Sequence, residues 1–398
     1  MGSIEIPKLI KIVISSYCRL GLWHHQDEPT AKEIGKKIVF SIYILLFPIS
    51  IMAGCITSDN DDEKVFLFEE IIMVTVLAVK LVNVIWKKRQ ICDLLQAIGV
   101  YSIQDRKVLC LIRGELQNVV KFLNIFVISS LVVTICSMVV VPFIGNERKL
   151  LLDIEFPMDW KNDNIAFWLA FAFFITEVLL VFAAFLLSVL TWYLMANCAL
   201  RYRIIGHQIK DMAVEKAVVT VDIESSAEAD NMGLKVSEAQ RFMSDLHDII
   251  ESHKQTKELT DQLYSFISTT ISIQTTTSAA CIGCSIYCLT FNECENFMEK
   301  TIFIAILVYN IFDIFMIMYF GNEIELSSEQ LGYCLFESDW IGQPQASKKC
   351  IILFGELIRQ PHEFLILKLH PLNLATFTEI MNSAYSMFNI LKSLKEIQ

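Results

Sequence analysis

The stretch that decides the fold is residues 371–394, PLNLATFTEIMNSAYSMFNILKSL, the last apolar run of the chain. Its length suits a membrane-crossing helix, which needs roughly 20 residues. Polar residues recur along it at steps of three and four, so a helix gathers them into one stripe. The stripe consists of Glu379, Asn382, Ser386, Asn389 and Ser393. Because lipid offers polar groups no partner, this face either lines water or bonds to neighbouring helices in a bundle.

The composition of the whole chain indicates a polytopic membrane protein. Of 398 residues, 54% are hydrophobic and 19% are charged, whereas a soluble globular chain normally carries about a quarter charged residues. The mean hydropathy is +0.49. The apolar composition makes the lipid membrane an expected partner. The formal net charge is -11 and no basic patch interrupts it, so we expect no nucleic acid as a partner.

Signatures of enzyme chemistry and of metal binding are missing from the sequence. There is no phosphate-binding loop, nucleophile elbow or metalloprotease helix. The seven histidines do not fall at ligand spacing. Cys281, Cys284 and Cys288 share one face of an apolar helix without His or carboxylate neighbours, which favours small-residue packing over a metal site. We expect no enzymatic activity, no cofactor and no metal.

Long apolar runs predict an all-α protein with seven transmembrane helices. The fourth run exceeds what a bilayer requires, so we expect that helix to project into the cytoplasm. The seven runs are residues 38–56, 65–86, 122–145, 165–200, 263–292, 301–322 and 371–395.

The runs divide the chain into six parts. The N-terminal part is amphipathic and basic, and it either lies on the membrane surface or packs as a plain helix against the bundle. The two polar parts between later spans are expected inside the cell, each with a helix. The parts are 1–36 (N-terminus), 37–200 (helices one to four, with the ligand-pocket walls), 201–262 (cytoplasmic loop and helical extension), 263–322 (helices five and six), 323–370 (cytoplasmic segment and helix) and 371–395 (the last helix).

Short basic flanks predict the orientation of the chain. Lysines and arginines at 36–37 and 87–89 bracket one side of the membrane, which the positive-inside rule assigns to the cytoplasm. The N-terminus is then cytoplasmic, and seven spans place the C-terminus outside the cell. This orientation is opposite to that of G-protein-coupled receptors.

Three ionisable residues, Lys80, Glu177 and Asp313, fall inside predicted spans. Such groups must face protein or water. One interpretation is a mutual pair or a link to the Ser- and Thr-rich fifth span, and the other is contact with a ligand.

Apolar and aromatic residues in the outer halves of the second, fourth and sixth spans could wall a pocket for a small volatile molecule. The same residues could instead pack against one another or face lipid. The ligand-binding candidates are Ile71, Thr75, Phe167, Phe171, Phe174, Phe303, Ile306 and Tyr309.

The C-terminal stretch resembles the signature of the insect odorant receptors. Phe377 is followed by Ser386-Met387-Phe388 and a closing apolar-polar run. That family usually carries Ser or Thr, then Tyr, then Phe at this place; here Met387 replaces the Tyr, and Tyr385 lies two residues earlier. The insect gustatory receptors, a sister family, usually end in a Thr-Tyr pair and a later Gln-Phe pair, which this chain lacks.

The resemblance implies an odorant-tuning subunit of a ligand-gated, nonselective cation channel. It implies a small volatile odorant as ligand, a heterotetramer with the insect odorant co-receptor, and a place in the dendrite membrane of olfactory sensory neurons. It also implies that the last helices ring the pore, lined by Asn382, Ser386, Asn389 and Ser393, with an apolar gate at Ile390 and Leu394. A gustatory-type channel and a seven-span metabotropic chemoreceptor are the alternatives, and a transporter lacks the expected inverted repeats.

Overall fold

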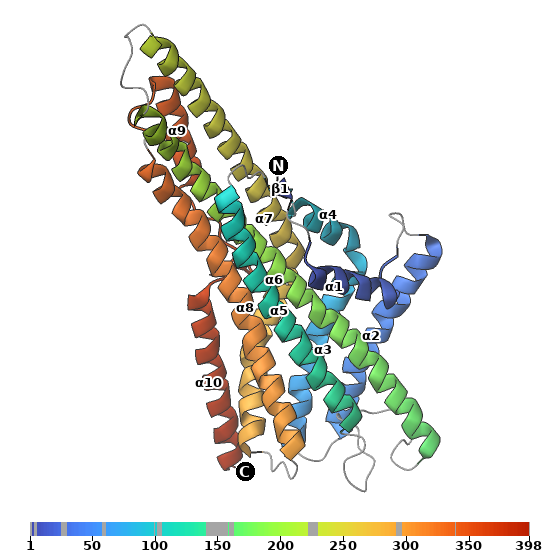
Figure 1. Cartoon of the computed structure of the whole chain (residues 1–398). Helices are drawn as coiled ribbons and strands as arrows, with labels where there is room; N and C mark the ends of the chain where they lie inside the picture. The colour runs from blue at the N-terminus through green and yellow to red at the C-terminus, as the bar shows by residue number, and fades with distance from the viewer. Residues whose placement is uncertain are drawn as a thin grey trace.

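The computed structural model is a bundle of long helices (Figure 1). It describes residues 2–3, 6–24, 30–57, 61–98, 100–101, 106–140, 158, 163–221, 230–291, 297–338 and 340–397. The sequence predicts an outer loop at 146–164 and a polar break at 223–228, and both fall almost wholly outside the described residues.

The described part of the chain is almost entirely α-helical, as the apolar runs predict. Two short antiparallel pairs, β1 (Gly2–Ser3) with β2 (Val100–Tyr101) and β3 (Leu365–Ile366) with β4 (His370–Pro371), are its β-structure. The helices are α1 (Lys8–Arg19), α2 (Ala31–Thr57), α3 (Asp61–Trp86), α4 (Lys88–Ile98), α5 (Arg106–Val140), α6 (Asn164–Val221), α7 (Asp230–Phe291), α8 (Phe297–Glu337), α9 (Gln345–Ile358) and α10 (Leu374–Ile397).

Helices α6 and α7 are far longer than a membrane is thick. They contain 58 and 62 residues, which at 1.5 Å per residue is about 90 Å each, against about 30 Å of hydrocarbon. Their connected ends form an extension together with α9, at the end of the molecule opposite the C-terminus (Figure 1). The sequence predicts a separate helix at 237–261 before the fifth span, but α7 is continuous because no Gly or Pro interrupts residues 234–282.

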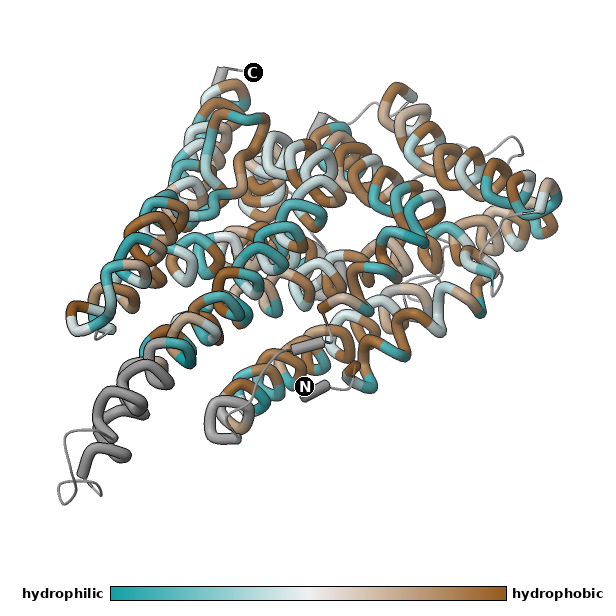
Figure 2. The backbone as a smooth tube through the Cα atoms, turned by 90° about the horizontal axis from the view of Figure 1, so that it is seen from above, coloured by the Kyte–Doolittle hydropathy of each residue, from teal (hydrophilic) through white to brown (hydrophobic). Residues whose placement is uncertain are grey.

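Helix α6 forms the centre of the bundle. Every residue from 183 to 202 is buried, as expected for a helix that is apolar on all sides. The outer helices α2 and α5 instead expose apolar side chains such as Ile42, Ile128 and Val132, a surface that suits lipid. In Figure 2, apolar (brown) and polar (teal) residues are intermixed along the helices.

By length and composition, four described helical segments are suited to crossing a membrane: Ala31–Thr57, Ile112–Cys136, Asn164–Met212 and Ile304–Glu337. The other predicted spans correspond to α3, α7 and α10. These helices carry ionisable side chains, Ser and Thr residues, and the polar stripe, which lower their apolar character.

The N-terminal helix α1 packs against the bundle. Its apolar side chains Leu9, Ile10 and Val13 are buried, and the hydroxyl of Tyr17 donates a hydrogen bond to the carbonyl of Ala183, 3.3 Å away. The structure therefore favours the packed-helix interpretation of the basic N-terminal segment, with its apolar face turned to protein.

Candidate functional site: the last helix, the outer aromatic cluster and a buried ion pair

Helix α10 docks on α7 and α8 along one narrow face. Thr376, Ile380 and Ala384 are buried on that face. Asn373 caps the start of the helix, since its side-chain oxygen accepts a hydrogen bond from the backbone N–H of Thr376 at 3.2 Å. Figure 1 shows α10 at the edge of the bundle, beside α8.

The opposite face of α10 is exposed and carries the polar stripe. All five stripe residues are exposed, and Ile390 and Leu394 are each 57% exposed. The hydroxyl of Ser386 bonds within the helix, to the carbonyl of Asn382 at 3.0 Å. The chain by itself thus leaves a mixed polar and apolar helix face uncovered, unlike the apolar outer faces of α2 and α5.

Four predicted pocket residues lie together in an outer cluster between α2, α3 and α6. Phe167 and Phe174 are buried there, with Ile71 and Phe171 partly buried against them. The rings of Phe167 and Phe171 stack with centroids 6.2 Å apart. Thr75 is exposed, and its hydroxyl bonds to the carbonyl of Ile71 at 2.6 Å on its own helix.

Tyr309 lies apart from this cluster. Its ring contacts Phe185, with centroids 5.6 Å apart. Because Phe185 follows Phe174, the nearest of the cluster's phenylalanines, by 11 positions on α6, the two places are about 16 Å apart along the helix. Ile306 is partly buried one turn from Tyr309, and the side chain of Phe303 falls outside the described residues. The predicted pocket residues therefore belong to two separate places.

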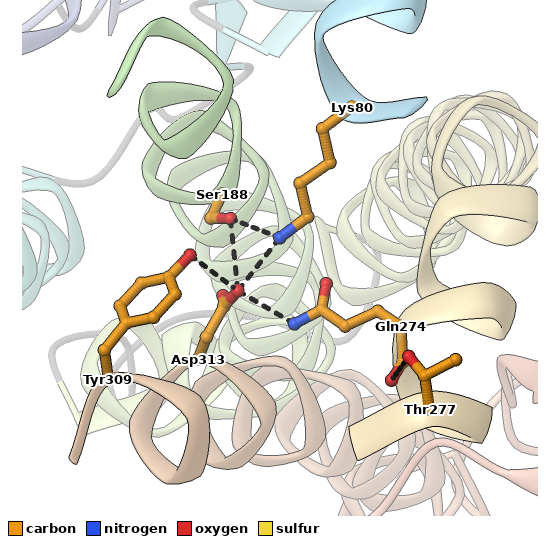
Figure 3. A network of polar contacts seen from close by, with 6 residues as sticks. All are labelled: Lys80, Ser188, Gln274, Thr277, Tyr309 and Asp313. Atoms are coloured by element: carbon orange, nitrogen blue, oxygen red, sulfur yellow. Dashed lines mark hydrogen bonds and ion pairs between the residues drawn. The ribbon is translucent and has the colours of Figure 1, made fainter. Parts of the chain in front are cut away.

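A buried ion pair joins α3 to α8 deeper in the bundle (Figure 3). The ammonium of Lys80 lies 2.9 Å from Oδ2 of Asp313, and both side chains are nearly inaccessible. Lys80 also donates to Ser188 on α6 at 2.8 Å, and the amide of Gln274 on α7 donates to Asp313 at 2.8 Å. The hydroxyl of Tyr309 donates to the same oxygen at 3.2 Å.

This network confirms both parts of the packing interpretation of Lys80 and Asp313, a mutual pair and a link to the fifth span. Glu177 does not take part: it is fully buried, and neither carboxylate oxygen has a hydrogen-bond partner. Ser188 and Gln274 were not predicted, because uncharged polar residues in a Ser- and Thr-rich bundle give no distinct signal in the sequence.

A small cavity adjoins the ion pair. The volume that the centre of a water molecule can occupy in it is about 20 Å³, which is room for roughly one water molecule. Its walls are Lys80, Leu187, Ser188, Thr191, Phe266, Ile267, Thr270, Ile271, Gln274 and Ile317.

A second polar contact connects α3, α7 and α8. The carboxylate of Glu69 accepts hydrogen bonds from the hydroxyl of Ser285 and, at 3.4 Å, from the amide of Asn310. The predicted packing cysteines Cys281 and Cys284 are buried on the same helix as Ser285. Within the described ranges, no three His, Cys, Asp or Glu side chains converge as a metal site would need.

The long extension contains two histidines, His253 and His362, packed among aromatic rings. His253 on α7 packs against Tyr202 and Phe354, with ring centroids 6.2 and 5.7 Å apart. Burial lowers the pKa of His253 to about 4, and the nearby Lys257 adds to the shift. The imidazole of His362 stacks on Tyr202 and lies 3.6 Å from a carboxylate oxygen of Asp261.

Comparison with solved structures shows that the fold is similar to that of an insect olfactory receptor. The fold matches the olfactory receptor OR5 from Machilis hrabei in complex with eugenol, with a TM-score of 0.76, over 97% of this chain and 98% of that chain, at 12% identity. A second structure of the same receptor gives a TM-score of 0.77 over 96% of this chain and 97% of that one.

Comparison of sequences agrees with the fold. Odorant receptor 23a of Drosophila melanogaster is 23% identical over 288 residues, which are 70% of this chain and 68% of that protein. Odorant receptor 10 of Aedes albopictus is 25% identical over 144 residues, which are 36% of this chain and 38% of that protein. The family model described as 7tm Odorant receptor matches residues 67–385, well over half of the sequence. The chain therefore belongs to the insect odorant receptor family of seven-transmembrane membrane proteins.

Proposed function

We propose that this chain is the odorant-tuning subunit of a ligand-gated, nonselective cation channel. The proposal combines the family membership with one observation on the structure. The observation is that α10 turns its polar stripe away from its own chain, whereas the outer helices present apolar residues.

The exposed stripe supports a pore made from several subunits. In hydrocarbon, the side-chain amides of Asn382 and Asn389 would lack partners, which is costly. A ring of equivalent helices around water removes that cost, and one chain contributes one such helix. We propose a heterotetramer with the insect odorant co-receptor, in the dendrite membrane of olfactory neurons, with the N-terminus cytoplasmic and the C-terminus extracellular.

The proposed gate consists of Ile390 and Leu394. Both lie on the exposed face of α10, one turn apart, at the end of the helix away from the long extension. A ring of such apolar side chains can close a pore by excluding water. Replacing Leu394 by Ala should raise the current without ligand, whereas Leu391→Ala, on the partly buried side of α10, should leave gating by this ring unchanged.

The proposed ligand is a small volatile molecule. The similar Machilis hrabei receptor is described with eugenol, and the outer part of this chain is rich in aromatic side chains. We propose contacts from the outer cluster around Phe167, Phe171 and Phe174 or from Tyr309 and its neighbour Ile306. Ligand must favour the open state to produce current.

Whole-cell recording from cells that express this chain with and without the co-receptor tests the function. We expect a fast, nonselective cation current under a panel of volatiles only when both chains are present. Current from this chain alone would favour a gustatory-type channel. A response that depends on a G protein, together with an extracellular N-terminus, would contradict the channel function.

Cysteine accessibility tests the position of the stripe. A charged thiol reagent applied to a Ser386→Cys channel should block the current, because water reaches a pore-lining side chain. The matched control is Ile128→Cys, on the lipid-facing side of α5 and 60% exposed. If neither variant responds to the reagent, α10 does not line the pore.

A further inference from the structure

We propose that the polar cluster around Asp313 is a relay between Tyr309 and the last helix. A change in the hydrogen bond from Tyr309 to Asp313 alters the hydrogen bonding of α7, and α7 in turn alters the packing of α10. The proposal rests on the channel function proposed above. The relay consists of Tyr309 and Asp313 on α8, Lys80 on α3, and Gln274 on α7, and we call it the Asp313 relay.

One oxygen of Asp313 serves all the partners of the relay. Its Oδ2 receives hydrogen bonds from Lys80 at 2.9 Å, Gln274 at 2.8 Å and Tyr309 at 3.2 Å, while Ser188 lies 3.5 Å away. The other oxygen, Oδ1, is buried without a hydrogen-bond partner. Because a carboxylate oxygen has about two lone pairs, these donors compete, and withdrawing one of them strengthens the bonds of the others.

The side-chain amide of Gln274 has a second hydrogen-bonding arrangement open to it. Its side-chain oxygen is buried without a partner, the residue is 8% exposed, and it lines the cavity together with Lys80. Figure 3 shows the amide nitrogen of Gln274 directed at Asp313 and its oxygen on the side of the Lys80 ammonium. That ammonium has three N–H donors, of which Ser188 and Asp313 take two. A turn of the Gln274 amide into the water-sized cavity therefore exchanges Asp313 for Lys80 or water.

Movement at Gln274 reaches the pore helix through one rigid element. Helix α7 continues without a break from Gln274 to Gly283, about 14 Å further on. At Gly283 the two helices touch: a Cβ placed there would lie 2.8 Å from Cβ of Met387 on α10 and 3.0 Å from the carbonyl oxygen of Ala384. The relay thus joins a candidate ligand contact to the packing of α10 by direct contacts, the kind of two-arrangement network that can couple distant sites.

The test is a double-mutant cycle on the odorant concentration that gives half-maximal current in the complete channel. Tyr309→Phe removes only the hydroxyl and keeps the ring against Phe185, and Gln274→Met removes the amide at similar size. Each single variant should shift this concentration by roughly 5-fold or more, the lower end of typical allosteric couplings. The double variant should shift it no further than the larger single effect, since both changes break one path.

The matched control is Tyr43→Phe. Tyr43 also loses a hydrogen bond, 2.6 Å long, to Thr176, and Thr176 lies 12 positions, about 18 Å, from Ser188 along α6. Its effect should multiply with that of Gln274→Met. Variants that reach the cell surface poorly are purified and compared by their melting temperatures in detergent. The changes in melting temperature caused by Tyr309→Phe and Gln274→Met should again be non-additive.

The possible outcomes separate the relay from the channel function. If wild type conducts normally and Tyr309→Phe and Gln274→Met act independently in current and melting temperature, or if Tyr309→Phe has no effect on the odorant response, the relay is wrong. If wild type with the co-receptor passes no odorant-evoked current, the channel function itself fails and the relay falls with it.

Discussion

Leu367 and Lys368 form the tight turn between β3 and β4 with an unfavourable backbone. Their φ angles are 50° and 61°, and the turn closes with a hydrogen bond from the N–H of Leu369 to the carbonyl of Ile366, 2.9 Å long. Such left-handed pairs favour Asn and Gly, because a Cβ crowds the following carbonyl. The turn is followed by β4 and then by α10. Leu367 also donates its N–H to the hydroxyl of Ser272 on α7 at 3.3 Å.

Replacing Lys368 by Gly should therefore stabilise the protein. Removing the Cβ relieves a left-handed residue by about 1 kcal/mol, and thermal unfolding of the purified protein in detergent would show a higher melting temperature. Lys368→Ala keeps the Cβ and serves as the control, with no gain expected. A gain of the same size in both variants would mean that loss of the lysine side chain, and not backbone strain, was responsible.

At the scale of elements, the docking of α10 depends on two glycines. Gly283 allows the close contact with Met387 described above. At Gly321 on α8, an added Cβ would lie 2.2 Å from the carbonyl oxygen of Leu372, which leads into α10. That carbonyl cannot move aside freely, because the N–H of Leu372 is bonded to the carbonyl of Phe364 at 2.8 Å.

Gly321→Ala should destabilise the protein by about 1–3 kcal/mol, the usual cost of overpacking, and should alter the odorant-evoked current. Melting temperature and current amplitude measure the two effects. Gly332→Ala on the same helix is the control, because its Cβ meets no atom within 4 Å; there the better helix propensity of Ala should stabilise by up to about 1 kcal/mol. A Gly321→Ala protein as stable as wild type would contradict the close approach of α10.

At the scale of the whole molecule, the histidines of the extension make the stability of the fold depend on pH. The folded state holds the pKa of His253 near 4 instead of 6.5, mainly through burial, and burial also lowers the pKa of His362. Between pH 6.5 and 4 the unfolded chain binds more protons at these sites than the folded chain. Stability is therefore fully present above pH 6.5 and is lost as the pH falls towards 4.

His253→Phe should weaken this loss, since a neutral ring keeps the packing against Tyr202 and Phe354. Melting temperatures measured from pH 7 to pH 4.5 should fall less steeply for this variant than for wild type. His247→Gln, at an exposed position of the same helix, should follow the wild-type slope. An unchanged slope for His253→Phe would assign the acid sensitivity to other groups.

Much of the architecture was readable from the sequence because it depends on local periods. Apolar runs of membrane length predicted the helices, and the spacing of Asn382, Ser386 and Asn389 predicted a stripe that the structure indeed leaves exposed. The cluster of Phe167, Phe171 and Phe174 followed in the same way, since steps of three and four place side chains on one helix face.

Contacts between distant helices were decided only by the tertiary structure. Lys80 and Asp313 are separated by 233 positions and Gln274 and Asp313 by 39, and no local period says which helix faces meet. For the same reason, the sequence-based prediction placed Tyr309 in one pocket with the outer phenylalanines. In the structure, the crossing of α6 and α8 places Tyr309 beside Phe185. The sequence alone determined a membrane bundle with a polar last helix, because hydropathy and helical period act within each segment. Which buried charges pair, where the aromatic residues gather and how α10 meets α7 depend on the angles at which helices cross, which only the packed structure fixes.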